Sequence, residues 1–390
     1  MSDPSTVVSR AWVEVDEAAL RRNLRRVKDA AGPGASVVPM LKANAYGMGA
    51  GAVLRMVRAE LAADELFAIG VAAVAEGEEL RALGWTGRVV VFAPAAPDEF
   101  ARAARADLAL ALSDLPAVRR WADVARESGR RLAFHAEVDT GMGRAGFPYT
   151  EAAGWGAAVD GVAADLLQWD GCFTHFHSAD EPDLGPTDEQ HRRFREALDA
   201  LPPRRDGTAR RVIHSANSAA ALRRHGYGGD VVRPGIFLYG GSAGPDAVPE
   251  AVASVRARVT LVKQVPAGWS CGYGATYTSR RPERWGTLGI GYGDGIPRAL
   301  SPAGGEALVR GRRVPVIGRI SMDLTVVDLT EVPEADVGDA ATLIGRDGGE
   351  EITVDQVAAK VGTISYEILT GLGGRQPRLY VNGTRTPGGA

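Results

Sequence analysis

Short apolar runs alternate with longer stretches rich in alanine, arginine and glutamate between residues 35 and 239. Short apolar runs bounded by turn residues are typical of buried strands, and the stretches between them have the composition of helices. We therefore predict eight strands, at residues 37–41, 66–70, 89–92, 108–112, 132–138, 172–176, 211–214 and 230–232.

Eight strand-and-helix units in this span predict a closed parallel (β/α)8 barrel of the TIM type. An open doubly wound sheet is disfavoured, because no Gly-x-Gly-x-x-Gly motif follows the first predicted strand. In a parallel barrel, functional groups gather at the carboxyl ends of the strands. Six side chains fall just inside or just beyond predicted strand ends: Lys42, Arg144, His175, Asn217, Ser218 and Arg233. We expect them to share one site.

The hydrophobic pattern changes after residue 239. The segment 240–245 is rich in glycine, proline and serine, which predicts a linker. The later apolar runs predict short strands at 255–262, 285–290, 308–316, 324–329 and 340–343, and a helix is expected near 355–361. The expected fold class is therefore α/β, with a barrel at 11–240 followed by a mainly β C-terminal domain at 241–383.

Composition narrows the class of protein. The chain of 390 residues is too long for one ordinary core, and its content of 45% hydrophobic and 24% charged residues is that of an ordinary soluble protein. The net charge of −3 gives no reason to expect nucleic acid or a membrane surface as a partner. Cys172 and Cys271 are too few for a disulfide framework. Because residues 1–6 lack a signal-peptide pattern and no apolar run would span a bilayer, we expect a cytoplasmic enzyme.

Lys42 ends an apolar run and precedes a tight loop of small residues, in Leu41-Lys42-Ala43-Asn44-Ala45-Tyr46-Gly47. An ammonium group there is costly to desolvate unless its pKa falls, and the neutral amine is the form that attacks a carbonyl. A pyridoxal phosphate enzyme requires such a lysine for its Schiff base. The alternative is a lysine that merely reaches solvent from a strand end. The only lysines of this arginine-rich chain are Lys28, Lys42, Lys263 and Lys360, which favours a chemical role for Lys42.

Five motifs follow one another in order along the chain. They are Lys42-Ala43-Asn44-Ala45-Tyr46-Gly47; Asp139-Thr140-Gly141-Met142-Gly143-Arg144; Thr174-His175-Phe176 with His214-Ser215-Ala216-Asn217-Ser218; Val232-Arg233-Pro234-Gly235 with Leu238-Tyr239-Gly240; and Gly272-Tyr273-Gly274 with Gly291-Tyr292-Gly293-Asp294-Gly295. From about residue 12 to residue 380 the chain resembles the alanine racemase family, fold-type III pyridoxal phosphate enzymes with a barrel and a β domain. The resemblance implies interconversion of L-alanine and D-alanine, with D-alanine supplied for peptidoglycan.

The resemblance implies two catalytic bases. Lys42 would hold pyridoxal 5'-phosphate and act on one face of the substrate α-carbon, and Tyr273 of a second subunit would act on the other face. A tyrosine has an unperturbed pKa near ~10, so it would need help to act as a base at neutral pH. The resemblance implies that this help comes from His175 and from Arg233 behind it. Arg233 would also face the pyridine nitrogen, which a guanidinium cannot protonate. A homodimer with shared active sites is therefore implied.

The resemblance also implies the binding residues. The phosphate of the cofactor would be held by Ser218, the backbone of Gly235 and Ile236, and the hydroxyls of Tyr46 and Tyr366. The complete cofactor set is Lys42, Tyr46, His175, Asn217, Ser218, Arg233, Gly235, Ile236 and Tyr366. Taken alone, Tyr366 would be an ordinary half-buried aromatic residue and Arg144 a surface ion-pair partner. The substrate set is Arg144, Tyr273, Tyr292, Met322 and Asp323.

Four positions depart from the family pattern. Glu137 stands where many members carry a carbamylated lysine, and because both present a carboxylate-type anion we predict an ion pair between Glu137 and Arg144. Met48 replaces a common histidine and Ser321 a frequent cysteine, and neither change obviously touches the chemistry. His177 stands where a small residue is usual, so the range of substrate side chains that the enzyme accepts stays open.

Two other functions fit the sequence less well. A decarboxylase of the same fold would place an acidic group at the pyridine nitrogen and use a cysteine of the partner subunit, and Arg233 and Tyr273 argue against it. A non-catalytic cofactor-binding protein of the single-barrel type would lack the β domain that carries Tyr273. A racemase acting on alanine is favoured, and a racemase of broader range, including serine, is the alternative. We expect no metal site, and we expect His135 and His214 to satisfy backbone groups at strand ends.

Overall fold

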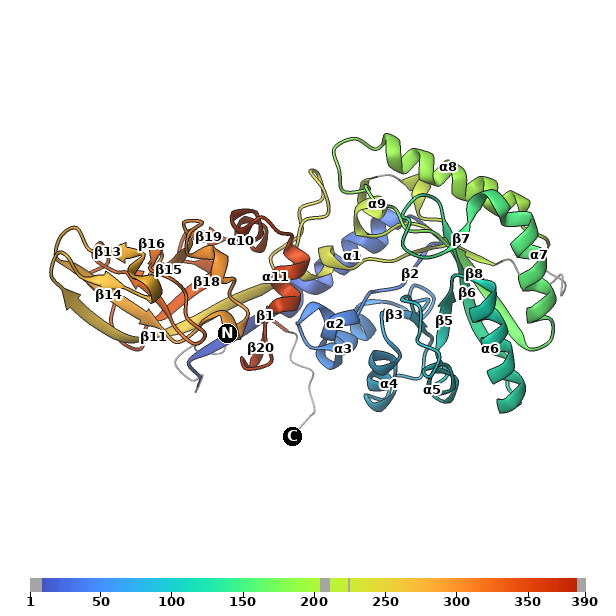
Figure 1. The fold of residues 1–390 in the computed structure, drawn as a ribbon, viewed down its shortest axis with the longest axis horizontal. Coiled ribbons are helices and arrows are strands. Elements are labelled where there is room, and N and C mark those ends of the chain that lie inside the picture. Colours follow the sequence, from blue (N-terminus) through green and yellow to red (C-terminus); the bar gives the residue numbers. More distant parts are fainter. Residues whose placement is uncertain (1–8, 204–210, 224, 384–390) are drawn as a thin grey trace.

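The computed structural model describes residues 9–203, 211–223 and 225–383. A barrel of strands surrounded by helices and a second body made mostly of strands lie along the long axis of the molecule (Figure 1). Strand β1 (Ala11–Asp16) and helix α11 (Ser365–Gly371) lie where the two bodies meet. None of the helices in the described residues has the length and apolar character needed to span a bilayer.

The barrel consists of parallel strands that close into a ring. Strands β3, β4, β5, β6, β8 and β9 pair in that order, and β10 pairs with β2. Bridges between Val37 and Leu66 and between Asn217 and Arg233 join the two sets. The barrel predicted from the alternating apolar runs is therefore confirmed. Its strands are β2 (Ser36–Val37), β3 (Ile69–Val71), β4 (Val89–Val91), β5 (Ala109–Leu112), β6 (Leu132–Asp139), β8 (Leu167–Phe173), β9 (Val212–His214) and β10 (Val231–Val232).

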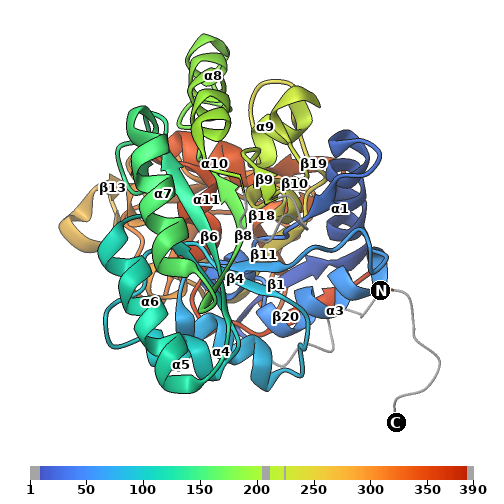
Figure 2. The same ribbon diagram turned by 90° about the vertical axis from the view of Figure 1, so that its right-hand side faces the viewer.

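Helices surround this ring (Figure 2). Their apolar faces are buried against the strands and their charged faces are outside, which is the arrangement that amphipathic patterning dictates. Asp16 caps α1 and Asp114 caps α6, each accepting a hydrogen bond from a backbone N–H of the first turn. The helices are α1 (Glu17–Ala31), α3 (Ala50–Glu60), α4 (Val74–Ala82), α5 (Phe100–Arg105), α6 (Leu115–Ser128), α7 (Ala152–Ala163), α8 (Gly185–Ala200) and α9 (Ser218–Arg223).

The β domain is also closed. Its sheet has the order β19-β18-β15-β16-β17-β14-β11-β1-β20, and β18 pairs with β11 as well, so that six of these strands form a ring. Helix α10 (Val354–Val361) follows β19, which lies outside that ring. The strands are β11 (Ala253–Val265), β14 (Glu283–Leu288), β15 (Glu306–Val309), β16 (Arg312–Ile317), β17 (Thr325–Asp328), β18 (Ala340–Asp347), β19 (Glu350–Ile352) and β20 (Arg378–Val381).

Two predictions of strand positions were wrong. The strand predicted at 172–176 is β8, which begins at Leu167; Gln168 and Asp170 alternate there with buried apolar residues, so no continuous apolar run marks its start. The strand predicted at 308–316 is the hairpin of β15 and β16, which turns at Arg310 and Gly311, both with positive φ. Residues 11–16 form β1, which pairs with β11 and β20.

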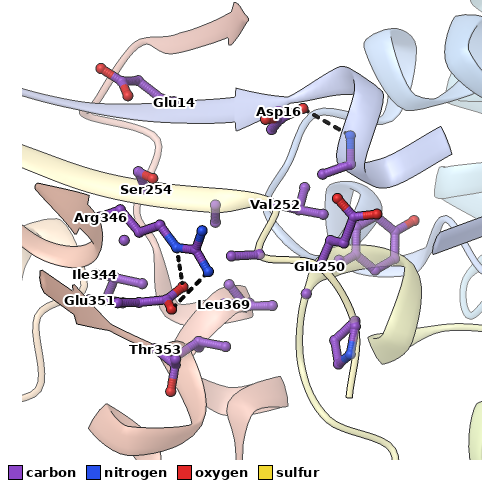
Figure 3. A pocket seen from close by; sticks show the side chains of 18 of the residues that line it. Glu14, Asp16, Glu250, Val252, Ser254, Ile344, Arg346, Glu351, Thr353 and Leu369 are labelled. Carbon is purple, nitrogen blue, oxygen red and sulfur yellow. Dashed lines mark hydrogen bonds and ion pairs between the residues drawn. The ribbon is translucent and has the colours of Figure 1, made fainter. Parts of the chain in front are cut away.

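A cavity of about 920 Å³ lies between α1, β11 and β18, away from the ends of the barrel strands. Figure 3 shows Arg346 paired with Glu351 at its wall, and Asp16 bound to the first turn of α1. Arg22 likewise pairs with Glu250 across the cavity. Asp16 and Asp355, which also line this cavity, bind neutral partners instead of arginines.

Candidate active site

The loop that carries Lys42 has an unusual backbone. Residues 42–46 form α2 (Lys42–Tyr46), in which Ala43, Asn44 and Ala45 have φ of 53°, 52° and 53°. Tyr46 also has φ of 53°. Left-handed conformations are costly for residues with a Cβ and occur in succession only where surrounding contacts impose them. This strained turn therefore places Lys42 at the carboxyl end of the first barrel strand with a defined orientation.

Two side chains hold the strained turn. Glu76, in the first turn of α4, accepts a hydrogen bond from the N–H of Ala43 at 2.6 Å. The same carboxylate accepts from the N–H groups of Ala72 and Ala73, at 2.8 Å and 3.0 Å. Asn44 accepts from the N–H of Ala50 at 2.8 Å. Glu76 thus ties the Lys42 loop to the loop after the neighbouring strand.

The Lys42 amine lies among positive charges. Burial lowers its pKa, the guanidinium groups of Arg144 and Arg233 lower it further, and Glu76 acts in the opposite direction. Each influence that lowers the pKa favours the neutral amine, the form required for nucleophilic attack on a carbonyl. The location and the direction of the pKa shift agree with the expectation for Lys42.

The residues predicted to hold a phosphate group converge beside Lys42. The N–H of Gly235 donates to the hydroxyl of Ser218 at 2.9 Å, and both residues are buried. The ring of Tyr46 stacks on Tyr239 at 4.6 Å and lies 6.1 Å from the ring of Tyr366. Ile236 is fully buried at the start of a short 3-10 helix. Asn217 is occupied differently, because its side-chain oxygen accepts from the N–H of Ala220 and caps α9.

Gly235 has no space for a side chain. A Cβ at this position would lie 2.3 Å from the hydroxyl of Tyr46. The backbone and the hydroxyl can therefore approach the same small volume, as binding of a phosphate group requires. Burial raises the pKa of Tyr46 and raises that of Tyr366 to about 12, so both hydroxyls keep their protons and can donate hydrogen bonds to an anion.

The guanidinium of Arg233 is hydrogen-bonded to several groups of the barrel. Its guanidinium donates to the carbonyl groups of His214 and Thr174, each at 2.9 Å, and to the carbonyl of Ser215 at 3.3 Å. It also donates to Nδ1 of His214 at 2.9 Å. Burial lowers the pKa of Arg233 to about 10, so it stays charged at neutral pH. The ring of His214 bonds Arg233 and His135, so the expectation that His135 and His214 satisfy backbone groups was wrong.

His175 follows β8 and is neutral at physiological pH. Burial lowers its pKa to about 3, and the positive charges of Arg233, Arg144 and Lys42 contribute in the same direction. A neutral imidazole can accept or donate a hydrogen bond without a change in net charge. His177, which follows two residues later, is exposed and bonds the hydroxyl of Ser178 at 2.6 Å.

The predicted ion pair between Glu137 and Arg144 is not formed. Glu137 is buried within β6, where it accepts a hydrogen bond from the hydroxyl of Ser113 at 3.2 Å. Arg144 is exposed on the following loop, where Gly141 and Gly143 have positive φ and donate their N–H groups to Asp139. The two side chains interact only through their charges: burial raises the pKa of Glu137, and the charge of Arg144 opposes this effect. The prediction was wrong because the buried carboxylate of Glu137 takes Ser113 as its hydrogen-bond partner, while Arg144 lies exposed on the loop after the strand.

The remaining predicted residues lie on the β domain. Tyr273, Tyr292 and Met322 have exposed fractions of 68%, 41% and 53%. The N–H of Tyr292 donates to the carbonyl of Ser321, and the carboxylate of Asp323 accepts from Arg375 at 2.6 Å. β13 (Tyr277–Thr278), which follows Tyr273, is well separated from α2 in Figure 1. The structure therefore brings the barrel residues together but leaves Tyr273 and its neighbours away from Lys42 of the same chain.

Family models and relatives of the chain indicate the same protein family. The model described as alanine racemase, N-terminal domain, matches residues 15–243, and that described as alanine racemase, C-terminal domain, matches residues 252–380. The chain belongs to the alanine racemase family. It is 37% identical over 383 residues to the alanine racemase of Halothermothrix orenii, an alignment that covers 95% of this chain and 97% of that protein.

Solved structures of the family are similar along almost the whole chain. Alanine racemase from Streptomyces lavendulae superposes with a TM-score of 0.88 at 33% identity, covering 97% of this chain and 98% of that one. The Bacillus anthracis enzyme, solved with bound L-Ala-P, has a TM-score of 0.85 at 33% identity and covers 96% of each chain. The Bartonella henselae enzyme, solved with covalently bound pyridoxal phosphate, has a TM-score of 0.84 at 27% identity, covering 96% of this chain and all of that one.

Sequence reasoning missed several residues that support the site. Glu76 has a recognisable signal, since it occupies the third position of α4, where a capping-box carboxylate is expected. Ser113 has no such local signal. Thr174 and Tyr239 lie within the motifs, but those motifs do not reveal that the carbonyl of Thr174 accepts from Arg233 or that the hydroxyl of Tyr239 donates to the carbonyl of Met40 at 2.8 Å. Their roles depend on strands that meet only in the folded barrel.

Proposed function

We propose that this protein interconverts L-alanine and D-alanine with pyridoxal 5'-phosphate as cofactor. The observation that carries the proposal is the amine of Lys42, which lies in a strained turn beside a buried cradle of Ser218, Gly235 and Tyr46. Membership of the alanine racemase family and similarity to structures solved with cofactor and with an alanine analogue support it. A role in supplying D-alanine for peptidoglycan and a cytoplasmic location are parts of the same proposal.

The residues present fit the cofactor. Lys42 would hold it covalently, and its phosphate would lie against Ser218, Gly235 and Ile236 with hydroxyls from Tyr46 and Tyr366. Asn217 would act indirectly, by capping the helix that begins at Ser218. Arg233 would present an N–H to the pyridine nitrogen. When bound, pyridoxal phosphate delocalises the electron pair that remains when the α-proton leaves the substrate.

Two groups would exchange the proton with the α-carbon. The Nζ atom of Lys42, whose pKa is lowered by burial and nearby arginines, would remove or return it on one face. Tyr273 from a partner subunit would do so on the other face, removing the proton as the phenolate and returning it as the hydroxyl. His175, kept neutral by burial and by the positive charges around it, would lie behind the tyrosine, where it could donate to the phenolate or accept from the hydroxyl without charging.

The substrate would be held by residues from both clusters. Arg144 is exposed at the mouth of the barrel, as a carboxylate-binding residue must be. Tyr292 and the backbone near Met322 would approach from the partner's β domain. Asp323 would act through Arg375, which its carboxylate already binds. Glu137, buried and without an ion pair, would influence Arg144 through its charge alone.

The exposed residues of the β domain support a homodimer. Leu261, Trp269, Tyr273, Tyr292 and Met322 expose between 41% and 68% of their surface, and exposed apolar residues of this size favour burial against another surface. We propose that the predicted barrel domain, 11–240, of one subunit faces the predicted β domain, 241–383, of its partner. Each site would then receive Lys42 from one chain and Tyr273 from the other.

Product analysis tests the function. The purified protein, incubated with single L-amino acids and cofactor, should convert L-alanine to D-alanine, resolved on a chiral column. Lys42→Ala should lose the absorbance of the lysine-bound cofactor together with activity. Tyr273→Phe should keep that absorbance but lose racemisation, most severely for one enantiomer. If no D-alanine forms and another amino acid is racemised instead, that amino acid is the substrate in place of alanine. Serine is the first to examine.

Mixed dimers test the shared site. Co-expression of Lys42→Ala and Tyr273→Phe chains yields heterodimers in which one site carries both changes and the other carries neither. If half of the dimers are mixed, activity should return to about a quarter of the wild-type value. Recovery of no activity would mean that Tyr273 serves the site of its own chain.

A further inference from the structure

Three buried side chains form a continuous hydrogen-bonded row inside the barrel. Nη1 of Arg233 lies 2.9 Å from Nδ1 of His214, and Nε2 of His214 lies 2.9 Å from Nδ1 of His135. The exposed fractions of these side chains are 5% or less. The row begins at the guanidinium beside the proposed cofactor site and runs toward the amino-terminal end of the barrel strands.

The chemistry of arginine gives this row a direction. A guanidinium can only donate, so Nδ1 of His214 must accept and carries no proton. A neutral imidazole has one N–H, which His214 must therefore carry on Nε2, where it donates to Nδ1 of His135. His135 in turn must carry its proton on Nε2. Burial lowers the pKa of His135 to about 3 and that of His214 well below its ordinary value, so both rings are neutral, as this assignment requires.

The row ends at a polar pocket below the barrel. A cavity of about 280 Å³ is lined by residues that begin the barrel strands, among them Arg88, Arg131, Gln168 and Asp170, and His135 forms part of its wall. Nε2 of His135 has no protein hydrogen-bond partner among the described residues, and it is not among their fully enclosed unpaired atoms. Its N–H therefore reaches the pocket, where water can accept it.

Packing fixes the orientation of both rings. Phe173 stacks on His214 with ring centres 5.0 Å apart and planes 10° apart, and Phe67 meets the edge of the His135 ring. Gly171 on the neighbouring strand lacks a side chain where a Cβ would lie 2.3 Å from Nδ1 of His135. These contacts leave each imidazole one position, so loss of one hydrogen bond cannot be repaired by rotation of the ring.

We propose that His135 is a positioning residue for Arg233, acting through His214, and that water in the pocket below the barrel completes the row. If His135 could not accept, the N–H of His214 would be buried without a partner, and the opposite tautomer would point an N–H at Arg233. Either outcome displaces the guanidinium. The effect on a cofactor ring rests on the proposed function, whereas the hydrogen-bonded row itself does not.

Nitrogen NMR of the full-length protein labelled with 15N-histidine tests the row directly. We expect His214 to have an unprotonated Nδ1 and a protonated Nε2, and His135 to have the same tautomer. A proton on Nδ1 of either ring, or on both nitrogens of one ring at neutral pH, would overturn the proposal. This measurement needs neither substrate nor activity, so it separates failure of the row from failure of the proposed function.

Two substitutions at one position test the effect on Arg233. In His135→Asn the amide oxygen can replace Nδ1 as acceptor, whereas His135→Leu removes the acceptor. For the cofactor-loaded enzyme we expect His135→Leu to shift the absorption maximum and to lower kcat by about tenfold, with KM within about twofold, because a buried donor is left unpaired. His135→Asn should restore most of the wild-type absorption maximum and most of the wild-type kcat.

Gln168→Leu is the matched control, because Gln168 lines the same pocket without contacting His135. It should leave spectrum and kcat unchanged. A folded His135→Leu protein with the wild-type spectrum and kcat would refute the proposal. If His135→Leu does not fold, the tautomers of the wild-type protein and the spectrum of His135→Asn decide the question.

Discussion

Removal of the Glu76 carboxylate should destabilise the Lys42 loop. This side chain accepts three backbone N–H groups from two loops, and one of them belongs to the residue that follows Lys42. The turn it holds has four consecutive non-glycine residues with positive φ, a conformation that costs roughly 1–2 kcal/mol per residue when nothing enforces it. The loop should therefore relax once its anchor is absent.

The magnitude follows from the number and type of bonds. A hydrogen bond to a charged group contributes about 1.5–3 kcal/mol. Glu76 is half-buried, so water replaces part of what is lost, and we expect Glu76→Ala to reduce the free energy of unfolding by about 3 kcal/mol. Glu76→Gln keeps one carbonyl oxygen and loses the charge, so its loss should be roughly 1–2 kcal/mol.

Thermal and denaturant unfolding of the full chain provide the assay. For a domain of this size, about 3 kcal/mol corresponds to a decrease in Tm of roughly 6–12 °C. Glu79→Ala is the control, since Glu79 lies on the same helix, is exposed and makes no side-chain hydrogen bond or ion pair within the described residues. A Glu76→Ala protein that melts within about 2 °C of Glu79→Ala would contradict the anchoring role.

Three further outcomes follow from the structure. The free energy of unfolding should fall as pH decreases from about 6.5 toward 5, by up to about 4 kcal/mol per pH unit in denaturant titrations. The reason is that the unfolded chain binds protons on three histidines whose pKa values are lowered in the folded protein, His135, His175 and His214. Gly235→Ala should weaken cofactor retention during gel filtration, because its Cβ would overlap the Tyr46 hydroxyl, whereas Gly154→Ala, with nothing within 4 Å of its Cβ, should not. Glu137→Gln should keep or raise Tm in a melting experiment, because it removes a buried charge and keeps an acceptor for Ser113; a drop of several degrees would show that the charge is needed.

The sequence predicted the features that depend on local pattern. Alternating apolar runs and helical stretches determined the barrel, and Lys42, Ser218 and Gly235 fell at strand ends because a parallel barrel collects such positions at one edge. The same local logic failed where polar residues interrupt a strand, as at Gln168 and Asp170, and where a turn divides an apolar run, as at Arg310.

Contacts between strands far apart in sequence were decided only by the tertiary structure. The sequence alone determined that a lysine ends the first barrel strand, because periodicity and turn residues act over a few positions. It could not determine that Glu76 holds the loop of that lysine, that Glu137 bonds Ser113 instead of Arg144, or that Arg233 is hydrogen-bonded to His214 and through it to His135. Those relations depend on the register in which separate strands meet and on the direction of each side chain, and both are set by packing of the whole barrel.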